Sequence, residues 1–318
     1  MRVDLNRMPV KRYEPQLPRP LSPQRMGAIR KRLLEWYADN EQPFPWRSAR
    51  DPYAALVAAV CAQQTQMSRV LEIYDRWMKA FPTIEDLAEA DSAEAIRVWG
   101  RAGYPRRAVY LHQTAQVVCN EHGGHLPTDR DSLERLPGVG PFTAAIILNF
   151  GHRLDAAAVD TNITRVLGRV LYGALQPALE TPARDIRWAS ERLLPDHQAT
   201  RWNPALMDFG ASICTPNPKC ELCPLTRLCD AHTKFKAGAR AEAVRAQPSF
   251  VGSQREIRGL LLSLLREAED PLPRDRVLQE VARRSGARRS RVALAEQSLI
   301  DDGLIRCADH KLFLGAET

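Results

Sequence analysis

Four of the seven cysteines lie in one short stretch of the sequence. They are Cys214, Cys220, Cys223 and Cys229. Spacings of five, two and five residues would let four thiolates ligate an iron–sulfur cluster or a zinc ion. The N-terminus has no hydrophobic signal core, so we expect a cytoplasmic protein whose clustered cysteines bind metal rather than form disulfides. The cysteines outside the cluster, Cys61, Cys119 and Cys307, are interpreted as structural.

An aspartate at the start of a predicted helix is the second candidate for chemistry. Asp160 lies in the segment AVDTN, where a helical pattern begins. Such an aspartate commonly caps a helix. An ionised carboxylate can also stabilise positive charge that develops during a reaction. Asn162 follows two residues later and could hold the carboxylate or a phosphate, so capping and catalysis both stay open here.

A glycine-rich turn precedes Asp160, and its last glycine, Gly140, lies 20 residues before that aspartate. Residues 136–141 read LPGVGP and have apolar helical patterns on both sides. Gly138 and Gly140 would let the backbone turn sharply, and a proline suits the first position of the following helix. The free N–H groups at that helix start, together with Val139, would form a site for an anion.

The composition favours a polyanionic partner. The chain has 318 residues, of which 44% are hydrophobic, enough for one large domain and a small one. Its net charge of +7 suits binding to nucleic acid. No run of about 18 apolar residues occurs, so no membrane span is expected.

The sequence divides into four predicted segments. Residues 1–21 are rich in proline and arginine and predict a flexible basic arm. Residues 22–230 form the main helical domain, which contains the motifs above. Residues 231–253 read as an Ala-, Lys- and Arg-rich linker with glycine and proline. Residues 254–318 predict three helices and a short hairpin.

The C-terminal segment resembles a winged-helix fold. Apolar residues at helical spacing mark its three helices, and residues 304–307 and 311–314 could pair as a wing. In such folds the start of the third helix touches DNA. We therefore expect DNA contacts from Arg288, Arg289 and Arg291.

Together, the hairpin, Asp160 and the cysteine cluster resemble the helix-hairpin-helix DNA glycosylases of the endonuclease III and MutY branch, over roughly residues 23–229. The resemblance implies an all-α, two-lobed fold that binds DNA between a helical bundle and a cluster-bearing lobe. It implies that Gly138, Val139 and Gly140 grip a phosphate and that Asp160 faces the sugar of a flipped-out nucleotide. It also implies a [4Fe–4S] cluster on the four cysteines. The usual spacing is six, two and five residues, so the first gap is one residue short, and zinc stays the alternative.

Two further motifs match the family in places that contact DNA. Residues 63–66 read QQTQ, and Gln64 matches the glutamine that fills the gap left by the flipped base. Residues 100–108 read GRAGYPRRA and resemble the family's GLGYYxRA segment. Tyr104 matches the tyrosine that wedges into the duplex, where an aromatic ring replaces lost stacking. Arg106 and Arg107 could reach phosphates.

The residues that define the substrate depart from the family. Ala59 stands where MutY enzymes carry their general-acid glutamate, and alanine cannot donate a proton. Phe142 stands where endonuclease III enzymes carry the lysine that attacks the sugar, so lyase chemistry by that route is excluded. We expect the flipped base to enter between Ala59, Gln63 and Phe142 on one side and Asp160 on the other.

The favoured hypothesis is a monofunctional base excision repair glycosylase that uses Asp160 to release a damaged or mispaired base from double-stranded DNA. Three alternatives stay open: a MutY-like adenine glycosylase at mismatches with 8-oxoguanine or guanine that has another acid, a uracil or thymine mismatch glycosylase, and a non-catalytic lesion-binding protein. We expect a monomer associated with the nucleoid.

Overall fold

The computed structural model describes residues 13–241 and 249–316. These residues form two compact units. The first, called the Asp160 unit, comprises residues 13–43 and 155–241. The second, called the hairpin unit, comprises residues 44–154 and 249–316. In the described ranges no helix is long and apolar enough to cross a membrane.

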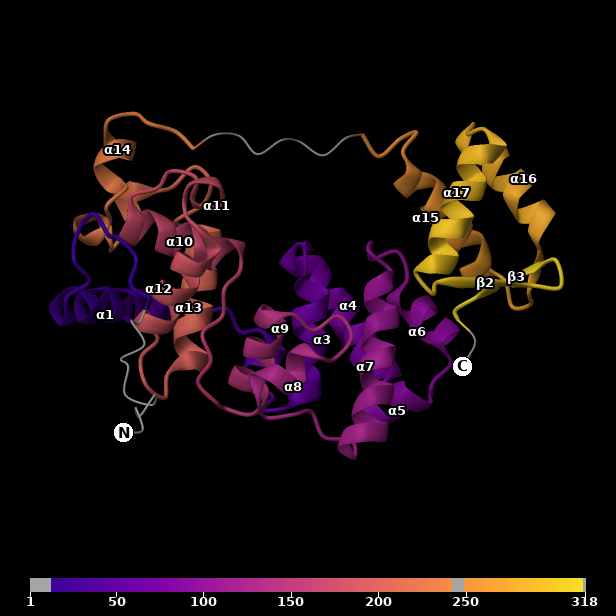
Figure 1. Ribbon diagram of the computed structural model, residues 1–318, viewed down its shortest axis with the longest axis horizontal. Coiled ribbons are helices and arrows are strands. Elements are labelled where there is room, and N and C mark those ends of the chain that lie inside the picture. Colours follow the sequence, from indigo (N-terminus) through magenta and orange to yellow (C-terminus); the bar gives the residue numbers. More distant parts are fainter. Residues whose placement is uncertain (1–12, 242–248, 317–318) are drawn as a thin grey trace, which may run out of the picture. The chain divides into compact units, whose positions relative to one another are not determined.

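The Asp160 unit is a helical bundle in which α13 packs against both α1 and α10 (Figure 1). Its helices are α1 (Pro23–Asn40), α10 (Thr161–Tyr172), α11 (Pro177–Glu180), α12 (Ala183–Leu193), α13 (Ala199–Ser212) and α14 (His232–Lys236). Leu33, Trp202 and Phe209 are buried in its core. Two 3₁₀ turns, Cys220–Leu222 and Thr226–Leu228, shape the loop that carries the cysteines.

Helix α13 approaches the start of α10 very closely at Gly210. A Cβ atom added to Gly210 would lie 2.7 Å from the Cβ of Asn162. Only glycine permits this approach. The packing of α13 therefore fixes the first turn of α10, which carries Asn162.

In the hairpin unit, α3 is buried on all sides and packs against α4, α9 and the π-helical turn η2. The first part of this unit contains α2 (Pro45–Ser48), α3 (Pro52–Ala62), α4 (Met67–Ala80), α5 (Ile84–Glu89), α6 (Ser92–Trp99), α7 (Arg106–His122), α8 (Arg130–Glu134), α9 (Pro141–Ile146) and η2 (Ile147–Gly151). Gly151 in η2 packs on Pro52, where an added Cβ would lie 2.5 Å from the Pro52 Cα. Helix α3 is therefore the central element of this part of the core.

The C-terminal part of the hairpin unit contains three helices and a small sheet (Figure 1). The helices are α15 (Gln254–Glu267), α16 (Arg274–Ser285) and α17 (Arg289–Asp301). The strands β1 (Leu272–Pro273), β2 (Ile305–Ala308) and β3 (Lys311–Leu314) pair antiparallel in the order β1-β3-β2. The predicted hairpin corresponds to β2 and β3, whereas β1 was not predicted. Leu261, Val281 and Leu299 form part of the core beneath it.

The predicted all-α architecture is confirmed, since the described sheet is confined to these three short strands. Two residues in the described part of the predicted basic arm contact the rest of the Asp160 unit. The Tyr13 hydroxyl donates to Asp185 and Arg19 pairs with Asp230. Residues 1–12 and 242–248, which belong to the predicted arm and linker, lie outside the described residues.

The turn between α8 and α9 gives the first testable prediction. Gly138 has φ +71°, and an added Cβ would lie 2.7 Å from the Cβ of Tyr110 on α7. Gly140 has ordinary φ, and an added Cβ there would meet nothing within 4 Å. We expect Gly138→Ala to lower the free energy of unfolding by about 3 kcal/mol, from backbone strain and overpacking together. Gly140→Ala is the matched control and should cost less than about 1 kcal/mol. Urea denaturation of both variants measures this, and equal losses would show that the Tyr110 contact does not govern the turn.

Candidate active site

Asp160 is the N-cap of α10, and both carboxylate oxygens have a defined partner. The Ile163 backbone N–H donates to Oδ1 at 2.7 Å, and the Asn162 side-chain amide donates to Oδ2 at 3.2 Å. The capping bond fixes the position of the carboxylate. Capping and chemistry are therefore compatible at this residue, because each oxygen retains a lone pair for another partner.

Burial dominates the electrostatics of Asp160. Loss of solvent raises the pKa of this carboxyl, whereas the bonds from Ile163 and Asn162 and the charge of Arg165 act in the opposite direction. The net shift is upward. A carboxylate that is poorly solvated and held in one orientation interacts strongly with a developing positive charge nearby.

A chain of polar contacts connects Asp160 to the cysteine loop. The Arg165 guanidinium donates to Asn162 Oδ1 at 2.6 Å, which orients the asparagine so that its amide N–H groups face Asp160. Arg165 also donates to the carbonyl oxygens of Cys214 at 2.6 Å and of Gly210 at 2.7 Å. The position of the loop at Cys214 is thus transmitted to the carboxylate through two side chains.

The cysteine loop lies around a buried arginine. Arg169 is 1% exposed, and its guanidinium lies 3.6 Å from the Cys214 sulfur and donates to the carbonyls of Thr215 and Pro216. Its guanidinium also stacks over the Phe235 ring at 4.8 Å. A buried positive charge beside Cys214 offsets the negative charge that metal-bound thiolates would introduce.

The thiols of Cys223 and Cys229 lie in poorly solvated surroundings that contain backbone donors. Burial raises the pKa of Cys223 to about 12 and that of Cys229 to about 11, while backbone N–H groups facing both sulfurs act in the opposite direction. These N–H groups would stabilise thiolates bound to a metal. Within the described ranges, no three ligating side chains converge as one metal ion requires.

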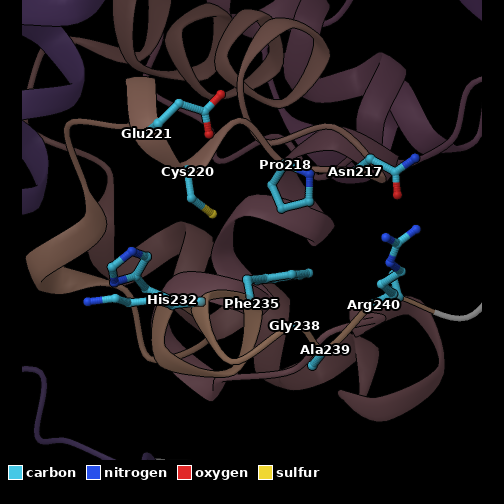
Figure 2. Close-up of a pocket in the computed structure, with 11 residues that line it drawn as sticks. Asn217, Pro218, Cys220, Glu221, His232, Phe235, Gly238, Ala239 and Arg240 are labelled. Atoms are coloured by element: carbon cyan, nitrogen blue, oxygen red, sulfur yellow. The ribbon is translucent and has the colours of Figure 1, made fainter.

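A cavity of about 820 Å³ lies beside this loop. Figure 2 shows Cys220 and Pro218 on one side of it and His232 and Phe235 of α14 on the other. Arg240 lies at a further edge. The cavity therefore adjoins the second cysteine of the loop.

In the hairpin unit, α7 supports the glycine turn from behind. The Thr114 hydroxyl donates to the Pro137 carbonyl at 2.8 Å, and Tyr110 packs against Gly138. Val139 is buried, and Gly140 is the N-cap of α9 with no capping side chain. The N–H groups at the start of α9 therefore lack a side-chain acceptor, as the anion site predicted from the sequence requires.

The residues expected around the base also lie in this unit. Ala59 is 4% exposed in the central helix α3. Gln63 is the C-cap of that helix, Gln64 follows with φ +51°, and both side chains are exposed. Phe142 is half-buried in the first turn of α9. The left-handed conformation of Gln64, uncommon for a residue other than glycine, turns the chain sharply after α3.

The neighbouring residues Arg106 and Arg107 have different environments. Arg107 is 6% exposed, and its guanidinium donates to the carbonyls of Val60, Gln63 and Gly103 at 2.8, 2.8 and 3.2 Å. This departs from the expected phosphate contact, because the donors are already committed inside the protein. Arg106 is exposed and pairs with Asp302 at 3.1 Å.

Tyr104, which lies just before these two arginines in the chain, projects into solvent. Its side chain is 51% exposed, its φ is +46°, and the Arg107 guanidinium lies 5.6 Å from the ring centre. By bonding to Gln63 and Gly103 together, Arg107 joins the two segments that carry the expected DNA contacts. The sequence alone did not indicate this positioning role of Arg107.

The three arginines predicted to touch DNA lie at the start of α17. Arg288 is its N-cap, and Arg288, Arg289 and Arg291 are all exposed. Arg291 donates to the Gly252 carbonyl at 2.8 Å, so part of its hydrogen-bonding capacity is used within the protein. The role of Arg165 was also not predicted, although its position three residues after Asn162 on a helix places the two side chains together.

Comparisons with known proteins agree with this geometry. The model of the HhH-GPD superfamily of base excision DNA repair proteins matches residues 57–182. An adenine DNA glycosylase of Mycolicibacterium smegmatis is 37% identical over 288 residues, 90% of this chain and 95% of the relative. A thymine/uracil-DNA glycosylase of Methanothermobacter thermautotrophicus is 33% identical over 204 residues, 64% of this chain and 92% of the relative.

Solved structures give the same fold. A thermostable thymine-DNA glycosylase aligns with a TM-score of 0.62 and 31% identity, covering 66% of this chain and 98% of that one. An endonuclease III–DNA complex aligns with a TM-score of 0.59 at 23% identity, covering 69% and 100%. The chain therefore belongs to the helix-hairpin-helix superfamily of base excision DNA repair proteins. Within it, the chain is a DNA N-glycosylase of the MutY-like branch, which confirms the resemblance predicted from the sequence.

The contrast between Arg106 and Arg107 gives a second prediction. Arg107→Gln should lower the free energy of unfolding by about 3 kcal/mol, because buried carbonyls lose their donor. Arg106→Gln should leave the fold intact and reduce the salt dependence of DNA binding by about one unit of slope. Thermal unfolding and binding isotherms at several salt concentrations measure both. If the Arg107→Gln protein is stable but its DNA binding is weaker and less salt-dependent, Arg107 contacts a DNA phosphate after all.

Proposed function

We propose that this glycosylase is monofunctional and hydrolyses the bond between a flipped-out base and its sugar with Asp160 as its catalytic carboxylate. The observation that carries the proposal is the carboxylate held by Ile163 and Asn162 in a poorly solvated position. As the base leaves, positive charge grows on the sugar, and the ionised carboxylate stabilises it or forms a transient bond to it. Water then adds to the sugar carbon, which keeps the hydroxyl, and the proton of the water passes to the base, which has left as an anion.

Asn162 acts as a positioning residue in this proposal. Its amide donates to Asp160 while Arg165 holds its carbonyl oxygen. This arrangement leaves the charged form of Asp160 with a hydrogen-bond donor and prevents the asparagine from flipping. The carboxylate therefore keeps one orientation toward the sugar.

The base pocket selects by shape and stacking rather than by proton donation. Ala59, Gln63 and Phe142 line it in this proposal, and neither Ala59 nor Phe142 can supply a proton. A base that leaves readily without protonation fits such a pocket: a damaged, alkylated or deaminated base. Phe142 also excludes the attack on the sugar by an amine, so the enzyme lacks lyase activity by that route.

DNA contacts are assigned to the exposed features of the hairpin unit. The turn of Gly138, Val139 and Gly140 binds a phosphate, Gln64 fills the gap left by the base, and Tyr104 wedges into the stack. Arg106 reaches a neighbouring phosphate. Arg288, Arg289 and Arg291 at the start of α17 add further contacts.

The four cysteines of the loop, Cys214, Cys220, Cys223 and Cys229, hold a [4Fe–4S] cluster in this proposal. Two sulfurs face backbone N–H groups, and the buried cation of Arg169 lies beside a third. The cluster would stabilise the fold of the loop, and the loop positions Arg165 through the Cys214 carbonyl. The protein acts as a monomer on double-stranded DNA.

Adenine excision is the second candidate. Relatives that match most of this chain are named adenine DNA glycosylases, and the first match covers 90% of the chain, so it extends into the C-terminal segment. The absence of a carboxyl at Ala59 counts against adenine, which is a poor leaving group unless protonated.

Removal of uracil or thymine from mismatches is supported by the thymine-DNA glycosylase structure at 31% identity.

The function is tested by base release from a panel of duplexes, followed by alkaline cleavage of the abasic product. The panel carries adenine opposite 8-oxoguanine, uracil or thymine opposite guanine, hypoxanthine and alkylated purines. Release of one base by the cluster-loaded protein names the substrate. Silence across the panel, with tight binding to an abasic-site analogue, would favour a lesion-binding protein.

Asp160→Asn gives a third prediction. It should reduce base release at least 10³-fold, since an amide cannot carry the stabilising charge, while an asparagine still caps α10. Burial raises the pKa of Asp160, so its ionised form costs stability above the unfolded-state pKa. The variant should therefore melt at the same or a higher temperature at neutral pH. Turnover unchanged in Asp160→Asn would remove this residue from the chemistry.

Ala59→Glu gives a fourth prediction. We expect at most weak adenine release, because the pocket suits another base and a buried carboxyl at α3 costs stability. Ala59→Gln is the control, with similar volume and no proton to donate. Strong adenine release by Ala59→Glu alone would show instead that the scaffold is a disarmed adenine glycosylase.

A further inference from the structure

The C-terminal segment holds one end of the loop that carries Tyr104. This loop, residues 100–105, connects α6 to α7 and is called the Tyr104 loop. At its start, the Arg266 guanidinium of α15 donates to the Gly100 carbonyl. The next residue, Arg101, pairs with Glu267 at 3.2 Å and also donates to the Ser263 hydroxyl at 3.3 Å.

The same segment holds the other end of the loop. Arg106, the first residue of α7, pairs with Asp302 at 3.1 Å. Asp302 is the C-cap of α17 and also accepts from Arg258 of α15 at 2.5 Å. Because α15 and α17 pack together, the position of the Asp302 carboxylate is fixed. The two ends of the Tyr104 loop are thus held by one small folded segment.

Close backbone packing supports these contacts. A Cβ atom added to Gly315, just after β3, would lie 2.8 Å from the Ala93 backbone nitrogen of α6. The Ser92 hydroxyl donates to the Ala316 carbonyl at 3.3 Å. A Cβ on Gly303 would contact Val109 of α7. The segment therefore touches α6 and α7 on both sides of the loop as well as the loop itself.

The loop itself has a conformation that needs support. Gly100, Gly103 and Tyr104 have φ of +64°, +75° and +46°. A left-handed tyrosine costs about 1 kcal/mol or more relative to an extended one. Its ring is 51% exposed, so burial of the ring offsets only part of that cost. The conformation depends on the polar contacts at the ends of the loop and on the hydrogen bond that Arg107 of α7 donates to the Gly103 carbonyl.

We propose that the C-terminal segment braces the Tyr104 loop, and that Arg266 and Asp302 are positioning residues for insertion of Tyr104 into the DNA stack. This inference rests on the wedge role of Tyr104 in the proposed function. The brace lowers the entropy that the loop loses on insertion, because the loop is ordered before DNA arrives. Residues 254–318 then serve the flipping step whether or not α17 touches DNA.

The insertion step can be observed without knowing which base is excised. The probe is a duplex with a tetrahydrofuran abasic-site analogue and 2-aminopurine as its neighbour, whose fluorescence rises when stacking is disturbed. Stopped-flow mixing with the full-length, cluster-loaded protein gives the rate of unstacking. Asp302→Asn and Arg266→Met should slow it about tenfold, the usual effect of losing a charged hydrogen bond. Equilibrium affinity for undamaged duplex should change less than about twofold.

Matched variants separate positioning from general damage. Asp301→Asn changes the adjacent carboxylate, which contacts Gln297 and not the loop, and should behave as wild type. Asp302→Glu keeps the charge and should recover most of the rate. Melting temperatures identify any variant that unfolds. If Arg266→Met unfolds, the comparison of Asp302→Asn with Asp302→Glu still tests whether the C-terminal segment positions the Tyr104 loop.

The same assay distinguishes failure of the brace from failure of the proposed wedge. Tyr104→Ala should abolish the fluorescence change. If it does not, Tyr104 is not the wedge and the proposed function is wrong at that point. If it does, while Asp302→Asn and Arg266→Met unstack as fast as wild type, the brace is wrong. Faster unstacking in Asp302→Asn would also overturn it and show that Asp302 withholds Arg106 from DNA.

Discussion

The structure around the candidate site depends on how one carboxylate is held. Asp160 is the N-cap of α10, and hydrogen bonds from Ile163 and Asn162 fix its two carboxylate oxygens. Asn162 is held by Arg165, and Arg165 by the carbonyls of Gly210 and Cys214. The close approach of Gly210 to Asn162 makes this arrangement possible. Helix packing, the cysteine loop and the carboxylate thus form one connected structure, in which a change at the loop reaches the site through short, charged contacts.

The hairpin unit follows the same principle with arginine as the connecting residue. Arg107 bonds to the end of α3 and to the Tyr104 loop, so the polar turn at Gln63 and the exposed tyrosine keep a fixed relation. Arg106, one position earlier, faces outward and pairs with the C-terminal segment. Polar contacts therefore position the candidate residues in both units. Neither Ala59 nor Phe142 offers an acid to the expected base pocket. A glycosylase built this way relies on orientation and on charge at the sugar more than on help to the departing base.

The features that could be predicted from the sequence are local ones. The glycine turn, the capping aspartate and the cysteine spacing each lie within a few residues, so type and spacing reveal them. Arg106 and Arg107 could not be told apart, because neighbouring helical residues point about 100° apart and only packing decides which is buried. Asp302 is far from Arg106 in the sequence, and no local pattern predicts their pairing. Strand β1 has only two residues, too few for any periodic signal. Docking of Tyr13 and Arg19 likewise depends on distant acids, Asp185 and Asp230.

The pH dependence of single-turnover base release tests the central claim most directly. In the proposed chemistry only Asp160 titrates; it is active when ionised, and burial raises its pKa. The single-turnover rate of base release should therefore rise with pH through the pKa of Asp160 and then stay level. That pKa lies above the usual value for aspartate. Asp160→Asn should show no such rise. A bell-shaped profile, with the rate falling again at higher pH, would reveal a second group that donates a proton to the base and would contradict the account.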